Sequence, residues 1–144
     1  MRFRAAYINI ITPLLFLLLA GVAMPLSNPL SLPIKKYTLN NGLTLITHHI
    51  KEAPVLSLQV WFQVGSRNET EQNSGISHFI EHLLFKGSKK YPDSGEMEKV
   101  MESLGGNFNA GTSKDYTNYH VTLPKAGFAK ALEILASEVT EPLF

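Results

Sequence analysis

The sequence contains no cysteine among its 144 residues. This absence excludes disulfide bonds and thiolate ligands to zinc, so any metal site must use histidine or carboxylate side chains. There is no run of Lys or Arg and no basic stretch interleaved with aromatic residues, which makes nucleic acid a poor candidate partner. The formal net charge is +1, and 44% apolar with 17% charged residues is the composition of an ordinary globular domain.

The sequence also has no apolar run long enough to span a bilayer, which takes about 20 residues. Its longest run covers residues 14–24, follows two arginines, and includes Gly21-Val22-Ala23, which offers small residues for a cleavage site. This pattern predicts a signal peptide over residues 1–23 and hence a secreted or periplasmic protein. The alternative is an uncleaved membrane anchor facing the periplasm. Residues 24–34 contain three prolines and are expected to form an extended linker.

The most informative stretch is His78-Phe79-Ile80-Glu81-His82. In an α-helix each residue turns by about 100°, so His78 and His82 lie one above the other with Glu81 beside them. Two imidazoles one turn apart can bind a single Zn²⁺, and zinc lowers the pKa of a bound water to about 7. Glu81 lies close enough to take a proton from that water without ligating the metal. The motif predicts that His78 and His82 are metal ligands and that Glu81 is the catalytic general base.

The flanking residues predict how this helix packs and where it begins. Asn73 or Ser74 is expected to cap its N-terminus. Apolar residues on the face opposite the motif predict a stripe that packs in the core: Ile76, Phe79, Ile80, Leu83 and Leu84.

The rest of the chain predicts alternating groups of strands and helices. Strands are expected over residues 36–39, 43–48, 55–64, 107–112 and 116–123, with helices around the motif, after Asp93 and over residues 125–140. Asn41-Gly42 is typical of a hairpin turn between the first two strands. This order indicates an α+β fold, with helices packed on one face of a largely antiparallel sheet.

The second and third helices each carry a predicted core stripe. The second stripe, Met97, Val100, Met101 and Leu104, is interpreted as core and not as a set of sulfur ligands. The third is Phe128, Leu132, Leu135 and Val139.

Other titratable residues are weaker candidates for the metal site. His120 is a possible third ligand on its chemistry, although a strand histidine is more often a hydrogen-bonded or surface residue. The glutamates of the second and third helices are interpreted as solvated charges: Glu96, Glu98, Glu102, Glu133, Glu138 and Glu141.

Several stretches together resemble the N-terminal end of a pitrilysin/insulinase-family zinc peptidase. They are residues 40–43, 64–70, 75–88, 104–110 and 112–119, which cover most of residues 35–144 in the order and spacing of that family. The resemblance implies an inverted zincin with an incomplete LuxS/peptidase-like metalloenzyme fold. Residues 35–144 would then be the N-terminal part of the peptidase domain.

The resemblance also assigns roles that the residues alone do not. It implies one Zn²⁺ per complete active site, with a third ligand, a Glu, expected beyond Phe144. It places Asn109 and Ala110 at the cleft, where an extended peptide substrate adds to the sheet edge. A homologous second half or a partner subunit would close that cleft. The implied function is a zinc-dependent endopeptidase acting on extended or unfolded peptides, with this chain alone expected to be inactive.

Two alternatives stay open. One is a non-catalytic family subunit that clamps peptides or holds a catalytic partner. The other is a small self-contained zinc-binding domain, which would need His120 or a late Glu to complete the site.

Overall fold

The computed structural model describes residues 32–144. The predicted signal peptide and most of the predicted linker lie outside the described residues. The chain divides after Ile50 into two compact units, which are described separately. Within residues 32–144, no helix is both long and apolar enough to cross a membrane.

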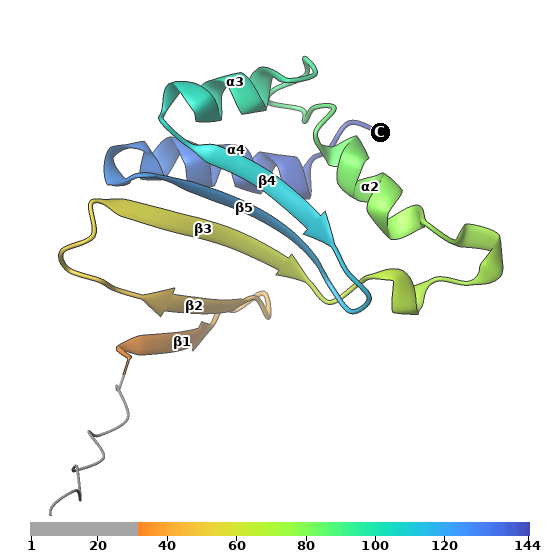
Figure 1. The fold of residues 1–144 in the computed structure, drawn as a ribbon, viewed down its shortest axis with the longest axis horizontal. Helices are drawn as coiled ribbons and strands as arrows, with labels where there is room; N and C mark the ends of the chain where they lie inside the picture. Colours follow the sequence, from red (N-terminus) through yellow and green to blue (C-terminus); the bar gives the residue numbers. More distant parts are fainter. Residues whose placement is uncertain (1–31) are drawn as a thin grey trace, which may run out of the picture. The chain divides into compact units, whose positions relative to one another are not determined.

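The described part of the first unit is a β-hairpin (Figure 1). Strand β1 (Ile34–Thr38) pairs antiparallel with β2 (Thr44–His48). Gly42 has a φ of 86°, a conformation that glycine adopts without steric cost, and its amide donates to the carbonyl of Leu39 at 2.9 Å. The predicted hairpin is confirmed, with β1 starting two residues earlier than predicted, at Ile34 inside the predicted linker.

The second unit contains a three-stranded antiparallel sheet (Figure 1). Its strands are β3 (Val55–Phe62), β4 (Asn107–Thr112) and β5 (Thr117–Pro124), in the order β3-β5-β4. Within this unit β5 is therefore central and β4 is an edge strand.

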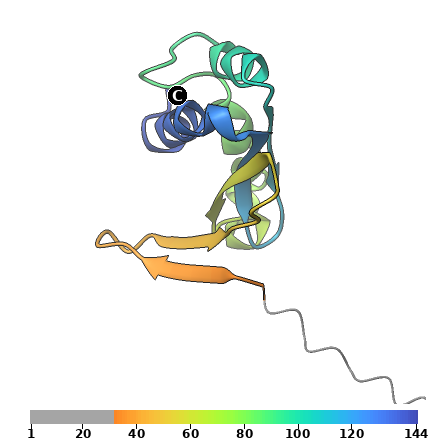
Figure 2. The ribbon, with the colours of Figure 1, turned by 90° about the vertical axis from the view of Figure 1, so that its left-hand side faces the viewer.

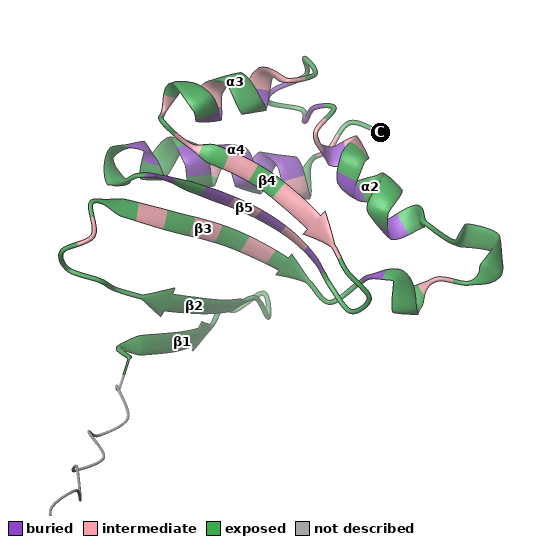
Figure 3. Ribbon diagram, in the orientation of Figure 1, coloured by how far each residue is buried: buried purple, intermediate pink, exposed green. Residues whose placement is uncertain are grey.

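Three helices accompany the sheet: α2 (Ile76–Leu84), α3 (Glu96–Ser103) and α4 (Phe128–Thr140). Figures 1 and 2 show α3 and α4 on one side of the sheet. Burial alternates along β5, as Figure 3 shows, because every second side chain faces these helices. The residues on that side of β5 are Thr117, Tyr119, Val121 and Leu123, all buried. The predicted α+β arrangement is confirmed.

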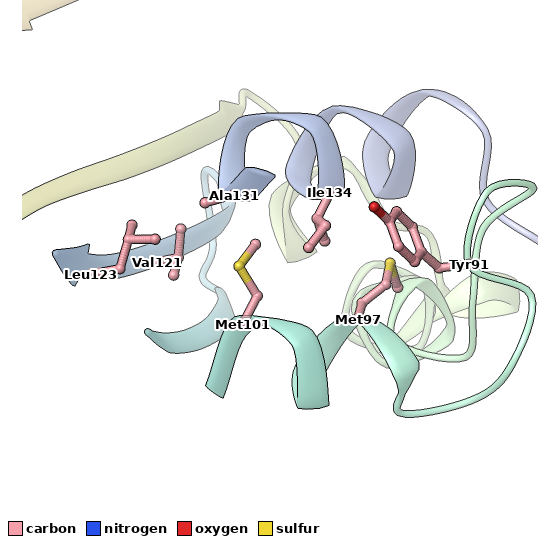
Figure 4. Packing of buried hydrophobic residues seen from close by; sticks show 7 residues of the cluster. All are labelled: Tyr91, Met97, Met101, Val121, Leu123, Ala131 and Ile134. Atoms are coloured by element: carbon pink, nitrogen blue, oxygen red, sulfur yellow. The ribbon is translucent and has the colours of Figure 1, made fainter. Parts of the chain in front are cut away.

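The core of the second unit lies between the sheet, α3 and α4 (Figure 4). Met97 and Met101 are 1% and 0% exposed and pack with Val121, Ala131 and Ile134. The interpretation of the methionine stripe as core is therefore confirmed.

Helix α4 buries a different face from the one predicted. Phe128 and Leu132 are exposed, and of the predicted stripe only Leu135 is fully buried. The buried positions follow the spacing i, i+3, i+4 and i+7, so the helix is rotated by roughly a quarter turn from the prediction. They are Ala131, Ile134, Leu135 and Glu138, and Ser137 beside them is buried as well.

The segment that leads into α2 is fastened to the turn between β4 and β5. The amide of Ser66 donates to the carbonyl of Ser113 at 3.1 Å. Arg67 forms a salt bridge with Asp115, with 2.9 Å between Nη1 and Oδ1. A Cβ atom on Gly65 would lie 2.3 Å from the Ser113 carbonyl oxygen, which only glycine avoids. The approach to α2 and the end of β4 are thereby held together.

Candidate metal and catalytic site

Helix α2 brings the two predicted ligands together. The Nε2 atoms of His78 and His82 lie 3.0 Å apart, and the ring centroids are 4.5 Å apart. A tetrahedral ion that binds two nitrogens at about 2.0–2.1 Å holds them about 3.3 Å from each other. Both side chains are exposed. The pair therefore presents two nitrogens to solvent at nearly the separation that one zinc ion requires.

Glu81 lies on the side of α2 that faces the sheet and is only 7% exposed. Its Oε2 accepts a hydrogen bond from the hydroxyl of Thr112, the last residue of β4, at 2.6 Å. A hydroxyl-to-carboxylate bond of this length is charge-assisted and short. No local pattern in the sequence indicates that Thr112 is part of the site, because Thr112 and Glu81 are separated by 31 positions.

The predicted core stripe of α2 is confirmed for Leu84, which is buried, but it is wrong for Ile76, Phe79 and Ile80. These three residues are 39%, 57% and 39% exposed, and Glu81 is buried in their place. The helix is rotated by roughly a quarter turn because its Glu81 side packs against β4 and β5.

An apolar hollow of about 380 Å³ adjoins the exposed face of α2. Ile76, Ile80 and Leu84 line it from the helix, with Phe62 from β3 and Val139 from α4. Within residues 51–144, apolar residues of α2 that were predicted to pack in the core therefore form the wall of an open hollow.

The N-terminus of α2 is capped by a residue that the sequence reasoning missed. The carboxylate of Glu69 accepts the amides of Gly75 at 2.7 Å and Ser77 at 2.9 Å. These two bonds lower the pKa of Glu69 below its ordinary value of 4.5. The predicted capping by Asn73 or Ser74 is therefore wrong. A carboxylate six residues upstream satisfies the free amides and complements the positive end of the helix.

We expect Glu69→Gln to loosen the first turn of α2. The glutamine side chain is uncharged and has only one oxygen, so it cannot accept both hydrogen bonds as the carboxylate does. Amide hydrogen exchange at Gly75 and Ser77 should become several-fold faster. The pKa of Glu69 is lowered in the folded chain, so its stabilising effect is present above pH 4.5 and is lost as the pH falls through the folded value. Glu71→Gln, a change in the same segment, is the matched control; equal exchange in both variants would contradict the capping role.

The other predicted site residues lie on the β4 edge. Asn109 is exposed, and its Oδ1 accepts the amide of Ala110 at 2.9 Å. Within the second unit no strand pairs with the outer side of β4. The structure thus shows an edge strand in which one amide is covered by a rotatable side chain.

His120 does not join the histidine pair. Its side chain lies on the other face of the sheet from that of Tyr119, and in the register His120 pairs with Asn109 of β4. Its Nδ1 is 3.2 Å from the side-chain amide nitrogen of Asn118. Among residues 32–144 no group of three His, Asp or Glu side chains is arranged to hold a metal ion. The described residues therefore supply two candidate ligands.

Glu138 departs from its interpretation as a solvated charge. It is 0% exposed on α4, and within residues 32–144 neither carboxylate oxygen has a hydrogen-bond partner. Burial, with a smaller contribution from the charge of Glu98, raises the pKa of Glu138 to about 8. The same burial effect, together with the charges of Glu138 and Glu81, raises the pKa of Tyr119. Burial without a hydrogen-bond partner therefore favours the protonated form of the Glu138 carboxyl.

Comparison with known proteins identifies the family. The model of the insulinase family, peptidase family M16, matches residues 44–144. The chain belongs to this family, and its resemblance to pitrilysin/insulinase-family peptidases is confirmed.

Individual relatives include both a named protease and a subunit of a complex. The chain is 41% identical over 100 residues to the zinc protease PqqE of Helicobacter pylori, covering 69% of this chain and 22% of the relative. It is 40% identical over 101 residues to the mitochondrial cytochrome b-c1 complex subunit 1 of Homo sapiens, covering 70% of this chain and 21% of that subunit. The crystal structure of pitrilysin matches with a TM-score of 0.72 and 28% identity, over 81% of this chain and 12% of pitrilysin. The chain thus spans about a fifth of the length of these curated relatives.

Proposed function

We propose that this chain supplies part of the active site of a zinc-dependent endopeptidase. The observation that carries the proposal is the pairing of two solvent-facing imidazole nitrogens, 3.0 Å apart, with a buried carboxylate between them on one helix. In a chain of the insulinase family, this arrangement is best explained by metal-assisted hydrolysis of a peptide bond.

The donor set fits zinc. His78 and His82 are the residues that would hold the ion, since their nitrogens lie close to the separation expected for two ligands of one tetrahedral centre. Zinc supplies Lewis acidity when bound, which lowers the pKa of water to about 7 and polarises a carbonyl group. We propose that a third ligand, a glutamate, comes from outside residues 32–144.

In this proposal Glu81 moves the proton. Its carboxylate accepts a proton from the attacking water and then delivers that proton to the amine of the leaving group. Glu81 directly precedes His82 on a helix that packs against the sheet, which would keep its carboxylate near the reacting atoms without making it a ligand.

The β4 edge is the proposed substrate-binding element. An extended peptide would pair with this strand through main-chain hydrogen bonds, which hold the scissile bond while reading little of its sequence. For the peptide to use the amide of Ala110, the side chain of Asn109 must rotate away from it. Extended or unfolded peptides are therefore the proposed substrates, and a homologous second half or partner subunit would complete the cleft.

The zinc content of the complete protein that carries this chain tests the proposal. We expect one zinc per active site after dialysis, measured by mass-spectrometric metal analysis. His78→Ala or His82→Ala should weaken zinc affinity by more than about 100-fold, since loss of a ligand exceeds the 10- to 100-fold cost of losing residues that merely orient one.

His120→Ala is the matched control, because this histidine lies away from the pair on β5. It should leave zinc affinity unchanged. Full zinc content in the His78 variant would refute the proposed site, and loss of zinc in the His120 variant would revive a self-contained domain.

The relationship to a cytochrome b-c1 complex subunit supports a second candidate function. Here the same fold would clamp peptides or hold a partner without catalysis. This function would be favoured if the complete protein bound a peptide but did not bind zinc and did not cleave the peptide.

Secretion or delivery to the periplasm stays a proposal that rests on residues 1–24 alone. The same residues, if uncleaved, would provide the only proposed contact with a membrane.

A further inference from the structure

The residue that contacts Glu81 lies on the strand proposed to align the substrate. Thr112 ends β4, two residues after Ala110, and its hydroxyl donates to Glu81 Oε2 at 2.6 Å. Two residues of a strand span about 6.8 Å. A single side chain thus connects the edge strand directly to the carboxylate of α2.

The direction of this hydrogen bond is fixed by its surroundings. Thr117, opposite Thr112 in the register, donates its hydroxyl proton to the carbonyl of Val64 at 3.0 Å. The two threonine hydroxyls are 3.4 Å apart, at the limit of a hydrogen bond. Since the proton of Thr117 is committed to Val64, that of Thr112 is free to be donated to Glu81, an acceptor when ionised.

The Thr112 side chain is itself firmly held. It is β-branched and half-buried, which restricts its χ1 rotation. The turn that follows is closed by the amide of Ser113, which donates to the carbonyl of Tyr116 at 2.8 Å, and by the contact between Gly65 and Ser113. The hydroxyl is therefore presented from a fixed point on the sheet.

We propose that Thr112 is a positioning residue that orients the Glu81 carboxylate relative to a peptide bound on β4. This inference rests on the proposed function and deepens it, because it makes one strand responsible both for aligning the substrate and for aiming the base. A base held at a fixed position relative to the scissile bond reacts as if it were part of the same molecule as the substrate. A small displacement of the base from that position therefore lowers the reaction rate.

Thr112→Val and Thr112→Ser in the complete protein form the test. Valine has nearly the same shape but cannot donate, whereas serine keeps the hydroxyl. Thr112→Val should lower kcat by about 10- to 100-fold, because misplacing a catalytic group by about 1 Å can cost about 100-fold in rate. KM and zinc content should not change, and Thr112→Ser should restore most of kcat. Thr122→Val, on β5 and exposed, is the matched control.

A second measurement does not depend on activity. In a double-mutant cycle of urea unfolding, Thr112→Val and Glu81→Ala should be non-additive, because each removes the same hydrogen bond. Additive effects, or full kcat in Thr112→Val beside an inactive Glu81→Gln, would overturn this inference alone. Full activity in Glu81→Gln would instead overturn the proposed function.

Discussion

Replacing Glu81 by Gln should lower the rate of peptide hydrolysis by about 10²- to 10⁴-fold, the usual contribution of a general base. The amide has nearly the shape of the carboxylate and can still accept from Thr112, but it cannot take a proton from water. The two imidazoles 3.0 Å apart are untouched. Zinc content should therefore be retained while kcat falls.

The measurement is cleavage of an unstructured fluorogenic peptide by the complete protein, with zinc determined on the same samples. Glu102→Gln on α3 is the control, because it removes an exposed carboxylate from the same unit. An active Glu81→Gln variant would remove Glu81 from the mechanism. Loss of zinc together with activity would instead show that Glu81 supports the metal site structurally.

The second large effect concerns stability and pH, and it comes from Glu138. The pKa of this carboxyl is about 8 in the folded chain, against 4.5 as its ordinary value. Below pH 4.5 it is protonated in both states. Between pH 4.5 and 8 only the unfolded chain ionises, so the free energy of unfolding falls by up to about 1.4 kcal/mol per pH unit. The total loss by pH 8 is about 5 kcal/mol.

Glu138→Gln should remove most of this dependence, because the amide does not titrate. The measurement is the free energy of urea unfolding of this chain at pH 5, 6, 7 and 8. Glu98→Gln removes a nearby negative charge and should reduce the dependence only in part. Glu102→Gln should not change it. If Glu138→Gln left the slope unchanged, Glu138 would have to be ionised in the folded chain.

The sequence predicted the features that depend on neighbouring residues. The hairpin of β1 and β2, the exact span of β4 and the pairing of His78 with His82 all follow from spacings of a few residues. The burial of Met97 and Met101 was also predicted, since the second helix has a single clear apolar stripe.

The sequence did not predict which face α2 or α4 buries, nor the partners of the site. Both helices have apolar residues around much of their circumference, so contacts with the sheet decide their rotation. Glu69 and Thr112 reach α2 from other segments, and no local pattern shows either contact. Glu138 lies seven residues after Ala131 in the buried stripe of α4, and a charged residue at such a position is read from the sequence as exposed.

The shortness of α2 determines when the histidine pair forms during synthesis. The helix has nine residues, fewer than the 12–15 or so that a helix needs to persist alone in water. The strands that it packs against, β4 and β5, come later in the chain and end at Pro124. A nascent chain that stops at residue 100 would contain the whole motif without the site. If the pair binds zinc as proposed, the ion would therefore bind late, after the sheet has folded.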